Sequence, residues 1–330
     1  MTGLGGAAGS SPDAVPPAER VAEREAVVVV TYNRADLLVA MLDGLADQTR
    51  PPDAVIVVNN ASSDHTRVVL DERDDLPLQT IHNLENLGGA GGFHRGVAEA
   101  YAQGFDRIWL MDDDVVPAPD CLEVLMRHDL PCLMAVREDR QGTLVEKSAL
   151  HFDLRNPLAL RPKRASVDTT FRTRAEMPEL VLVEVIAFEG FLVHREVIAA
   201  IGLPDPAYFI FYDDADFAIR ARKAGFTIHA VRDAVLVRQL DFDQQHDLGS
   251  WKGRFMYRNL FVVHFRHGEN ALVRAKPYLI TAGVVALSPV RKDGRREAGN
   301  VIRAIREARR LRSDPGSTSR AMSGPEAPRR

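Results

Sequence analysis

The stretch "AVVVVTYNRADLLVAMLDGLADQTRPPDAVIVVNN", residues 26–60, decides the fold because it contains two strands and the helix between them. Its first part, 26–32, is a continuous β-branched run, which is typical of a strand buried on both faces of a parallel sheet. Apolar residues then recur at helical spacing until Pro51 and Pro52 end the pattern, and a second strand is predicted over 54–60. A strand–helix–strand unit of this kind indicates an α/β fold.

The alternation of strands and helices continues beyond this unit. A helix is predicted to begin at Ser63 or Asp64, since either side chain can cap it. Next in chain order come a strand over 78–83, a helix over 90–104 and a strand over 106–112. The second half offers strand-like pieces over 180–188, 227–231 and 234–239 and helices over 214–224 and about 251–266. We therefore expect an open sheet with helices on both faces, and ligands beyond the carboxyl ends of its strands.

Composition places the chain among ordinary globular proteins. Its 330 residues are 45% hydrophobic and 27% charged, with a net charge of −4 that favours no particular partner. Two cysteines, Cys121 and Cys132, exclude a disulfide framework and lie in no metal-ligand spacing, which fits a reducing compartment. The most apolar run, 277–290, is bounded by prolines and is shorter than the roughly 20 residues that span a bilayer. The sequence predicts a soluble or peripheral protein.

Three adjacent carboxylates follow the fourth predicted strand in "WLMDDDVVP", residues 109–117. Adjacent negative charges repel one another, and Mg²⁺ or Mn²⁺ is commonly held by such oxygen ligands together with substrate phosphates. Side chains alternate along a strand, so Asp112 and Asp114 are predicted to share one face while Asp113 points elsewhere. The alternative is a solvated turn before Pro117. The position at the predicted ligand edge of the sheet favours the metal site.

A glycine-rich segment, "NLGGAGGFHRG" over 86–96, precedes the third predicted helix and has four glycines in five positions. Glycine allows a ligand to approach the backbone closely, and the start of a helix supplies donors for anionic groups. The spacing is neither that of a dinucleotide-binding motif nor that of a P-loop. The alternative is a turn whose glycines serve tight packing of the helix on a strand.

Polar side chains also end the first two strands, in "VTYNR" over 30–34 and "VNNASSD" over 58–64. Arg34 is suited to pair with a diphosphate, because its guanidinium offers a fork of donors. Asn59 and Asp64 could hydrogen-bond a base and a ribose. Each of these residues could equally be an ordinary capping or turn residue.

Taken in order, the segments "VVVVTYNR", "VNNASSDHT", "NLGGAGGF", "WLMDDD" and "FIFYDDADFAIRARKAGF" resemble a family 2 glycosyltransferase of the GT-A fold. The chain looks most similar to the galactofuranosyltransferases of actinobacterial cell-wall galactan assembly, with related rhamnosyltransferases near them. The match covers about residues 26–267. The resemblance implies a GT-A type, Rossmann-like open sheet with a C-terminal helical extension. It also implies a nucleotide-diphosphate sugar donor, a diphosphate chelated through Mg²⁺ or Mn²⁺, and inversion at the anomeric centre.

The resemblance assigns roles to individual residues at the donor side. Asp112 and Asp114 become the metal-facing acids, and Asp113 lies nearer the sugar or ribose. The predicted donor-binding residues are Thr31, Arg34, Asn59, Asp64, Asn86, Gly88, Gly89, Gly91, Gly92, Asp113, Arg238 and Arg258. Asn59 departs from the commoner Asp at its place, but an amide oxygen can still accept from a uracil or thymine ring nitrogen.

The segment "FYDDADF", 211–217, supplies the base by the same resemblance. Inverting transfer requires the acceptor hydroxyl to lose its proton, and a carboxylate whose pKa is raised by burial or by a like charge suits that role. Asp214 is the predicted base, and Asp213 is predicted to bind or orient the acceptor. The alternative is a helix start rich in Asp because the helix dipole favours negative charge there.

The acceptor is predicted to meet "FEGFLVHREVI", 188–198, where Glu189, Gly190 and Phe191 match a glycine-containing family segment. In "WKGRFMYRNLF", 251–261, Trp251 and Tyr257 are apolar enough to be core, and Arg258 could face the diphosphate.

One departure concerns a histidine that close relatives place as a further metal ligand about two dozen residues after the DDAD motif. Arg238 falls on that place here, and a guanidinium cannot ligate a metal, although it could neutralise the leaving diphosphate. Either metal use is altered or His229, Asp241 or His246 substitutes for the missing ligand. We leave these alternatives open.

The predicted organisation is a flexible leader over 1–24, a glycosyltransferase domain over 25–268, a basic helical segment over 269–312 and a disordered tail over 313–330. Within the domain, 25–130 is the nucleotide-sugar half and 131–268 the acceptor half. Residues 291–312 hold nine Arg or Lys against three Asp or Glu. The part over 298–312 could lie on anionic lipid, which would suit a polyprenyl-linked acceptor, or be a solvated terminal helix.

The predicted activity is transfer of a sugar from a UDP- or dTDP-linked donor to a glycan or polyprenyl-linked acceptor, with galactofuranose first and rhamnose second. A nucleotidyltransferase or nucleotide-sugar hydrolase would share the acidic metal site but would not need the acceptor base. A catalytically silent carbohydrate-binding module would not need either acidic cluster. We expect a cytoplasmic protein, peripheral at the inner face of the cell membrane if at all, with no nucleic-acid partner. The oligomeric state is left open.

Overall fold

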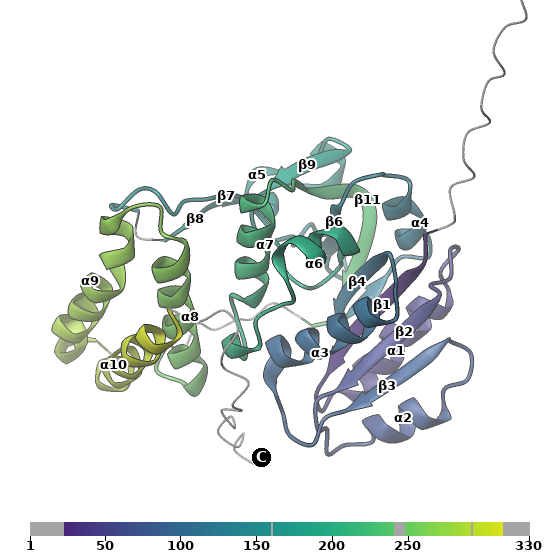
Figure 1. Cartoon of the computed structure of the whole chain (residues 1–330), viewed down its shortest axis with the longest axis horizontal. Helices are drawn as coiled ribbons and strands as arrows, with labels where there is room; N and C mark the ends of the chain where they lie inside the picture. The colour runs from purple at the N-terminus through teal and green to yellow at the C-terminus, as the bar shows by residue number, and fades with distance from the viewer. Residues whose placement is uncertain (1–22, 160, 241–247, 292, 313–330) are drawn as a thin grey trace, which may run out of the picture.

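The computed structural model describes residues 23–159, 161–240, 248–291 and 293–312 (Figure 1). Residues 1–22 of the predicted leader and the predicted tail over 313–330 lie outside the described residues. In chain order the strands are β1 (Glu25–Thr31), β2 (Ala54–Asn59), β3 (Leu78–His82), β4 (Arg107–Asp112), β5 (Val115–Pro117), β6 (Cys132–Glu138), β7 (Ala149–Phe152), β8 (Lys163–Ser166), β9 (Leu180–Val183), β10 (Phe191–His194) and β11 (Ile228–Arg238).

The helices alternate with the strands in the first half and gather at the C-terminal end. They are α1 (Ala35–Ala46), α2 (Thr66–Glu72), α3 (Gly88–Ala102), α4 (Cys121–Met126), α5 (Val167–Thr170), α6 (Arg195–Ile201), α7 (Asp213–Lys223), α8 (Trp251–His267), α9 (Ala271–Leu287) and α10 (Gly294–Leu311). Short 3₁₀ turns are η1 (Arg174–Glu176), η2 (Pro206–Tyr208) and η3 (Ser288–Val290). Figure 1 shows α8, α9 and α10 at one end of the molecule and β3 with α2 at the other.

The main sheet has the order β3–β2–β1–β4–β10–β6–β11–β5, with β9 also paired to β11. β1, β2, β3 and β4 run parallel, as the repeated strand–helix pattern predicts. β10 enters antiparallel between β4 and β6, so the sheet is mixed and spans both predicted halves. The register sets Thr31 opposite Asn59 and Val30 opposite Asp112, which aligns the carboxyl ends of β1, β2 and β4 at one edge.

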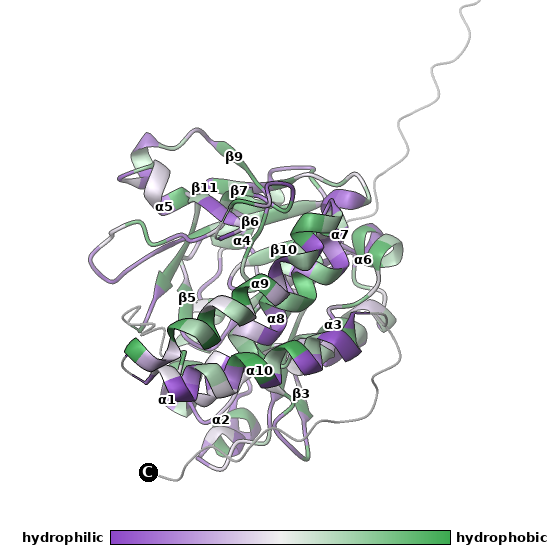
Figure 2. Cartoon of the chain, turned by 90° about the vertical axis from the view of Figure 1, so that its left-hand side faces the viewer, coloured by the Kyte–Doolittle hydropathy of each residue, from purple (hydrophilic) through white to green (hydrophobic). Residues whose placement is uncertain are grey.

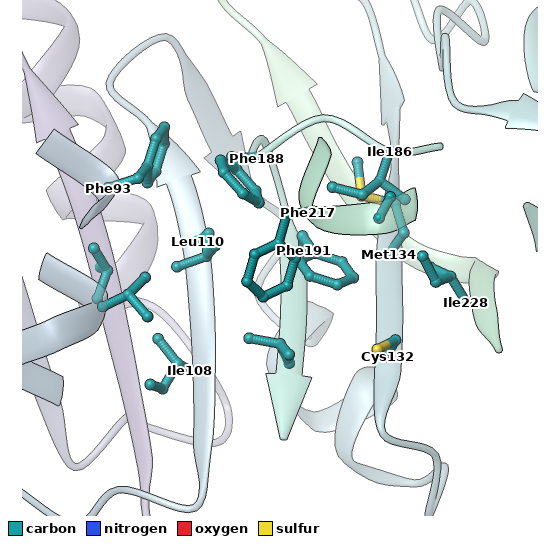
Figure 3. Close-up of a cluster of buried hydrophobic side chains, with 14 of the residues drawn as sticks. Phe93, Ile108, Leu110, Cys132, Met134, Ile186, Phe188, Phe191, Phe217 and Ile228 are labelled. Carbon is teal, nitrogen blue, oxygen red and sulfur yellow. The ribbon is translucent and has the colours of Figure 1, made fainter. Parts of the chain in front are cut away.

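Both faces of the sheet are covered, which confirms the predicted architecture. Alternate residues of β1 face two different cores: Val28 lies in one and Val27 in the other. The first core receives side chains from α3, α6 and α7, and the second from α1, α2 and α4. Figure 3 shows the first core, where the ring of Phe188 lies 5.0 Å from Phe93 and 5.7 Å from Phe217.

The structure differs from the expected elements in three places. The strand pieces over 227–231 and 234–239 form one strand, β11, with an irregularity in its pairing to β6 between Val231 and Val235. Of the piece over 180–188, only Leu180–Val183 is a strand. α2 begins at Thr66 rather than directly after Ser63 or Asp64, because His65 occupies the N-cap position.

The C-terminal helices pack on one another around a third core, in which Val301, Ala304 and Ala308 of α10 are fully buried. Pro277 was expected to bound the apolar run, but it lies inside α9, so that prediction was wrong. Within the part of the chain that the structure describes, Ala271–Val290 is one helical segment whose length and composition would suffice to cross a membrane.

Candidate active site

The acidic triplet lies at the end of β4, and β1 provides its first partners. Asp113 accepts a hydrogen bond from Thr31 Oγ1 at 2.8 Å and one from Arg34 Nη1 at 3.0 Å. The residue is only 3% exposed, so these two donors replace the water it would otherwise bind. Thr31 and Arg34 therefore fix the middle acid of the triplet, and a solvated turn, the alternative weighed from the sequence, is wrong.

Asp112 and Asp114 share a different neighbour, Glu189. Burial raises the pKa of Asp112 well above its ordinary range, and the charges of Glu189 and Asp114 add to the shift. Burial and Glu189 likewise raise the pKa of Asp114, against the opposing charge of Arg34, which lies 3.2 Å away. Asp113 and Asp114 nevertheless share Arg34 as a partner, and the strand ends at Asp112, with a turn over the next two residues. The expected division between the outer acids and Asp113 stays a prediction.

Glu189 connects the triplet to the second half of the chain. Its carboxylate accepts a hydrogen bond from Arg137 Nη1, and Arg238 Nη2 lies 3.8 Å from it. Burial alone would raise the pKa of Glu189, but Arg137 and Arg238 outweigh it and hold that pKa below its ordinary value. Glu189 was predicted at the acceptor; the structure places it between the acids after β4 and Asp214, whose charge it also influences.

The acidic residues fit a divalent cation in one specific respect. Asp114 Oδ1 is buried and has no hydrogen-bond partner, which is costly for a carboxylate unless another group satisfies it. Among the described residues, no three Asp, Glu, His or Cys side chains form a ready-made metal cluster. The two candidate ligands predicted from the sequence, Asp112 and Asp114, would match the pattern of one or two carboxylates completed by substrate phosphates.

The loops after β1 and β2 are joined to each other at the same edge. Asn33 Oδ1 accepts a hydrogen bond from the backbone N–H of Ser63 at 2.7 Å. Asp64 accepts from the N–H of Ala35, at the start of α1, at 3.1 Å and from Thr66 Oγ1 at 2.6 Å. Both oxygens of Asp64 thus serve capping, the alternative weighed from the sequence, and its contact with a donor stays a prediction.

Asn59 is also engaged by the protein. Its Oδ1 accepts from the backbone N–H of Ser62 at 2.9 Å, and its Nδ2 lies 3.2 Å from His82 Nδ1 of β3. The side chain is 4% exposed. Recognition of a base by Asn59 stays a prediction.

The glycine-rich turn is held by two asparagines. Asn60 Nδ2 donates to Asn86 Oδ1 at 3.0 Å and to the carbonyl of Gly88 at 2.9 Å. Gly88 has a φ of +72°, and a Cβ there would lie 2.0 Å from the carbonyl oxygen of Phe209. A side chain at Gly89 would meet nothing within 4 Å, so this is the glycine whose backbone is open to a ligand.

The next two glycines serve packing. A Cβ at Gly92 would lie 2.5 Å from Val30 Cγ1, and one at Gly91 would lie 2.5 Å from Leu87 Cβ. Both alternatives for the motif are therefore present in different residues: Gly92 allows α3 to pack tightly, and Gly89, in the first turn of α3, has open space beside its backbone. Direct donor contacts of Gly91 and Gly92 stay predictions.

Asp213 and Asp214 begin α7; Arg137 and Lys163 lower the pKa of Asp214, whereas no positively charged side chain is among the causes of the shift at Asp213. Burial, and next the charge of Asp214, raise the pKa of Asp213 to about 8. Burial raises the pKa of Asp214 to about 6, although the N–H of Ala215 opposes the shift and Glu189 favours it. At neutral pH Asp214 is thus mostly ionised and can accept a proton, whereas Asp213 is mostly protonated.

The loop before α7 is strained and is clamped from α8. Phe209, Phe211 and Tyr212 all have φ between +62° and +67°, which is unfavourable for side chains of this size. Asn259 is fully buried and its Nδ2 donates to the carbonyls of residues 208, 210 and 211 at 2.9, 2.7 and 2.9 Å. Arg258 Nη2 donates to the carbonyls of residues 207 and 208.

These contacts change the role of Arg258. It was predicted to face the diphosphate, but it is 3% exposed and holds the loop backbone, with its guanidinium 4.6 Å from the ring of Phe255. Burial lowers its pKa to about 10. Trp251 also differs from expectation, since it is 41% exposed rather than part of the core, whereas Tyr257 is buried as expected.

Two residues of the predicted acceptor segment belong to the interior. Phe191 is fully buried and packs with Phe188 and Phe217, as Figure 3 shows, so its predicted contact with an acceptor is wrong. Gly190 has a φ of +102°, and a Cβ there would lie 2.4 Å from Leu236 Cδ1. Gly190 lets the chain pass close to β11 and so brings Glu189 to the site.

The alternatives for the missing histidine ligand are narrowed. His229 pairs with Leu133 near the start of β11, nine residues before Arg238, which at about 3.3 Å per residue places it roughly 25–30 Å away. His229 is therefore excluded as a substitute. Asp241 and His246 lie outside the described residues. Arg238 itself pairs with Val115, directly after the acidic triplet, as the prediction of a donor-side position requires.

Several residues of the site were missed from the sequence. Arg137, at the end of β6, makes a two-pronged ion pair with fully buried Glu146, at 2.9 and 3.0 Å, and so orients Glu189. The feature of the sequence that could have indicated Arg137 is an arginine near the end of an apolar strand. Asn60 and Asn259 had no signal beyond their places beside motifs, because their function depends on backbone carbonyls far away in the sequence.

Comparison with known proteins gives the family to which this chain belongs. Residues 26–130 match the family described as glycosyl transferase family 2. The chain is 34% identical over 220 residues to the galactofuranosyltransferase GlfT1 of Mycobacterium tuberculosis. The aligned region covers 66% of this chain and 70% of that protein. The chain belongs to glycosyltransferase family 2.

Two further members of the family are also similar to this chain. The GlfT1 protein of Mycolicibacterium smegmatis is 33% identical over 201 residues, covering 60% of this chain and 65% of the relative, just under two thirds of its length. The O-antigen chain rhamnosyltransferase RfbN of Salmonella typhimurium is 25% identical over 213 residues, covering 64% of each chain. The predicted resemblance to galactofuranosyl- and rhamnosyltransferases is confirmed.

Solved structures confirm the GT-A type fold. GalNAc-T7, crystallised with UDP, GalNAc and Mn²⁺, matches with a TM-score of 0.57 at 14% identity, covering 78% of this chain and 51% of its own. The mannosyltransferase PcManGT of Pyrobaculum calidifontis, in complex with GDP-Man and Mn²⁺, matches with a TM-score of 0.51 at 18% identity and 88% coverage of both chains.

Proposed function

We propose that this chain is an inverting galactofuranosyltransferase that uses a nucleotide-diphosphate donor and a divalent cation. One observation carries the proposal: the charge of one residue, Glu189, raises the pKa of Asp112, of Asp114 and of Asp214, so the acids after β4 and the acidic start of α7 act on each other in one site. One group is suited to hold a cation and the other to accept a proton. The identity to the GlfT1 proteins supports galactofuranose as the sugar.

The donor side would be organised by the ends of β1 and β4. Asp112 and Asp114 would hold Mg²⁺ or Mn²⁺, which when bound would neutralise the charge of the leaving diphosphate. Arg34 now contacts both Asp113 and Asp114 and is 44% exposed, so it is free to turn toward a diphosphate once the acids have another partner. Gly89 offers open backbone near the start of α3 for the same anion.

On the acceptor side Asp214 would act as the general base. The acceptor hydroxyl gives its proton to the Asp214 carboxylate while its oxygen forms a bond to the anomeric carbon. The bond from that carbon to the diphosphate oxygen breaks on the opposite face, so the configuration inverts and the nucleoside diphosphate leaves. Asp213, protonated at neutral pH, can donate a hydrogen bond that orients the acceptor.

Rhamnose transfer from dTDP-rhamnose is the second candidate, supported by the identity to RfbN. The acceptor we propose is a glycan or a polyprenyl-linked glycan, which the similarity to galactofuranosyltransferases and the basic C-terminal segment support. The residues that contact it are proposed to include Glu189 and Asp213.

A thermal-shift screen of UDP- and dTDP-linked sugars, each with and without Mn²⁺, tests the donor and the cation together. A true donor at about 100 times its Kd should stabilise the fold by about 2.7 kcal/mol. We expect UDP-galactofuranose with Mn²⁺ to give the largest shift. A shift with dTDP-rhamnose alone would move the assignment to the second candidate, and no shift with any donor would overturn both.

Product analysis separates transfer from the related chemistries. The wild-type chain should form a glycoside of inverted anomeric configuration, visible in the proton coupling of the product by NMR. A nucleotide-sugar hydrolase would instead release free sugar with the acceptor unchanged, and a nucleotidyltransferase would form pyrophosphate linkages.

A further inference from the structure

The helix α9 presents an apolar face that the rest of the described chain does not cover. Leu279 and Leu287 of α9 are 70% and 54% exposed, and Val290 of η3, directly after α9, is 83% exposed. The segment 278–290 contains no charged residue. Only 17% of the most apolar stretch of this helix is buried, so it is not a core helix. An apolar face of this extent indicates an interaction site.

An arginine-rich helix lies beside this face. Figure 2 shows α9 and α10 next to each other on one side of the molecule, with apolar colouring along α9 and strongly hydrophilic segments along α10. The exposed arginines of this region are Arg291, Arg295, Arg296, Arg303, Arg306, Arg309, Arg310 and Arg312. Glu307 of α10 accepts from Arg254, and Glu297 accepts from Tyr257 and also pairs with Arg291 at 3.1 Å, which leaves the other seven arginines of this set without a partner among the two acids of α10. The exposed part of α10 is therefore strongly basic.

We propose that the exposed faces of α9 and α10, here called the α9–α10 surface, dock on an anionic lipid bilayer. The apolar side chains of α9 would enter the boundary between headgroups and acyl chains, and the arginines would contact lipid phosphates. Apolar and basic side chains on one face are the combination that such a boundary selects. The α9–α10 surface is separate from the acidic site, so the proposal does not depend on the transfer reaction.

The contacts of α9 favour docking over crossing of the membrane. Lys276 Nζ donates to the carbonyls of Asn156 and Ala159 at 2.7 and 2.8 Å, and Val273 is fully buried. α9 also packs against both α8 and α10. A spanning helix would have to break these contacts and bury the Lys276 ammonium in lipid, which is costly. The helix is thus held in the domain and can lie along a bilayer.

A second copy of the chain fits this surface less well than lipid does. A two-fold symmetric contact would place the same patch on both partners, so the arginines of one α10 would meet those of the other. Like charges across an interface are unfavourable. Anionic headgroups supply the charge that the surface lacks. Docking there would also face the protein toward a lipid-linked acceptor, if the proposed function holds.

Vesicle co-sedimentation of the full chain tests the proposal. Phosphatidylglycerol-containing vesicles should bind the wild type, neutral phosphatidylcholine vesicles should not, and binding should weaken in high salt. Arg303→Gln with Arg306→Gln and Arg310→Gln should lower partitioning about 100-fold, since each basic residue near an anionic surface contributes roughly a factor of five. The matched control changes three exposed arginines elsewhere, Arg67→Gln, Arg140→Gln and Arg172→Gln, and should bind as the wild type.

Apolar insertion needs its own variant. Leu279→Glu with Leu287→Glu should lower partitioning at least about tenfold. Leu182→Glu with Val68→Glu, which alters two apolar residues of similar exposure, 57% and 51%, should not. Thermal unfolding of each variant shows that the fold is kept.

A fluorescent label reports insertion directly and does not depend on loss of binding. Cys121 and Cys132 are both buried, so a dye attached through Leu279→Cys marks α9 alone. Its emission should shift to the blue with anionic vesicles, while the dye at Val68→Cys should not respond. Equal loss in the control variants, no response of the α9 label, or self-association that Leu279→Glu abolishes without any vesicle binding would each overturn the proposal.

Discussion

The acidic triplet after β4 and the acidic start of α7 each bring adjacent aspartates into the interior, but their neighbours differ. Arg34 reaches two acids of the triplet, with Asp114 Oδ1 left over, whereas Asp213 and Asp214 have mainly backbone N–H groups for partners. A third case is Asp216, next in the α7 cluster. Burial would raise its pKa, but His267 and Arg220 bring the pKa down to about 2.

The difference shows that the roles of these aspartates depend on their surroundings, because the residue type is the same. Acids that crowd together near an arginine can share a cation, and an acid with few positive neighbours keeps a pKa near neutrality and can accept a proton. Asp216 is permanently ionised and ties Tyr208 to His267, so it supports the loop before α7.

The substitution with the largest expected effect on the proposed division between the two acidic groups is Asp214→Asn. The change keeps the shape of the side chain but removes the proton acceptor, and general-base catalysis contributes about 100- to 10,000-fold. We expect kcat to fall about 1,000-fold while donor binding, measured by calorimetry, is unchanged. Asp120→Asn, another acid before a helix but outside the site, is the control and should retain activity. Unchanged turnover in the Asp214 variant would remove Asp214 from the mechanism.

The triplet should respond in the opposite sense to the same kind of change. Asp112→Asn relieves the burial of a charge beside Glu189 and Asp114, so we expect the metal-free protein to melt a few degrees higher, about 1 kcal/mol. Transfer should nevertheless fall about 100-fold or more, because one of two metal-facing acids is lost. Scanning calorimetry with and without Mn²⁺ and donor measures both effects. A variant that melts at a lower temperature than the wild type would contradict the idea that the crowded acids destabilise the metal-free protein.

The clamp on the α7 side gives a third test, with a matched pair. Asn259→Ala removes hydrogen bonds to three carbonyls of the strained loop, and we expect kcat to fall about 10- to 100-fold as the base loses its position. Asn300→Ala also removes two hydrogen bonds to backbone carbonyls, those of residues 248 and 250, but far from Asp214 in the chain.

Both variants should lose about 1–3 kcal/mol of unfolding free energy, since each leaves carbonyls without donors. Only Asn259→Ala should lower kcat, with the KM of the donor unchanged. Equal kcat in the two variants would reduce Asn259 to a purely structural residue.

How far the sequence predicts these features depends on how local their causes are. β1 and α1 were predicted closely because their apolar periodicity lies within the elements themselves. The role of Glu189 was not, because it depends on Arg137, and Arg137 in turn on Glu146, from three separate segments. Pairing over such distances leaves no periodic pattern.

Other misses have the same origin. β11 continues through Arg232 and Asp233, where the sequence favours a break, and the N–H of Arg232 donates to the carbonyl of residue 179 at 2.9 Å although the pairing with β6 shifts register there. Arg258 was predicted to face a ligand, but the direction of its side chain is set by the carbonyls of a strained loop that no local pattern reveals. The acidic residues of the site were thus easier to predict from the sequence than the contacts that position them.

The pH dependence of transfer sharpens the division between Asp213 and Asp214. With the pKa of Asp214 raised to about 6, kcat/KM should rise about tenfold per pH unit below that value and level off above it. Asp213, whose pKa is raised to about 8, stays mostly protonated below about pH 7, where the acidic limb lies, so Asp213→Asn should leave that limb in place. Rate measurements from pH 4.5 to 8 in both proteins test this. A limb that moves by a full unit in the variant would show that the two acids share one proton.

Stability provides the most selective test of Asp213. The folded pKa of Asp213 is raised above its model-peptide value of 3.8, so the folded state binds its proton more tightly than the unfolded state does. This contribution to stability is fully present below about pH 4 and is lost as the pH rises toward 8. Asp213→Asn removes that dependence without adding charge, so the melting temperature of the variant minus that of the wild type should increase steadily from pH 4 to 8. If the difference in melting temperature stays constant over this range, the pKa of Asp213 is not raised by burial. Asp213 would then be in contact with solvent, and the contrast between the start of α7 and the acidic triplet would be wrong.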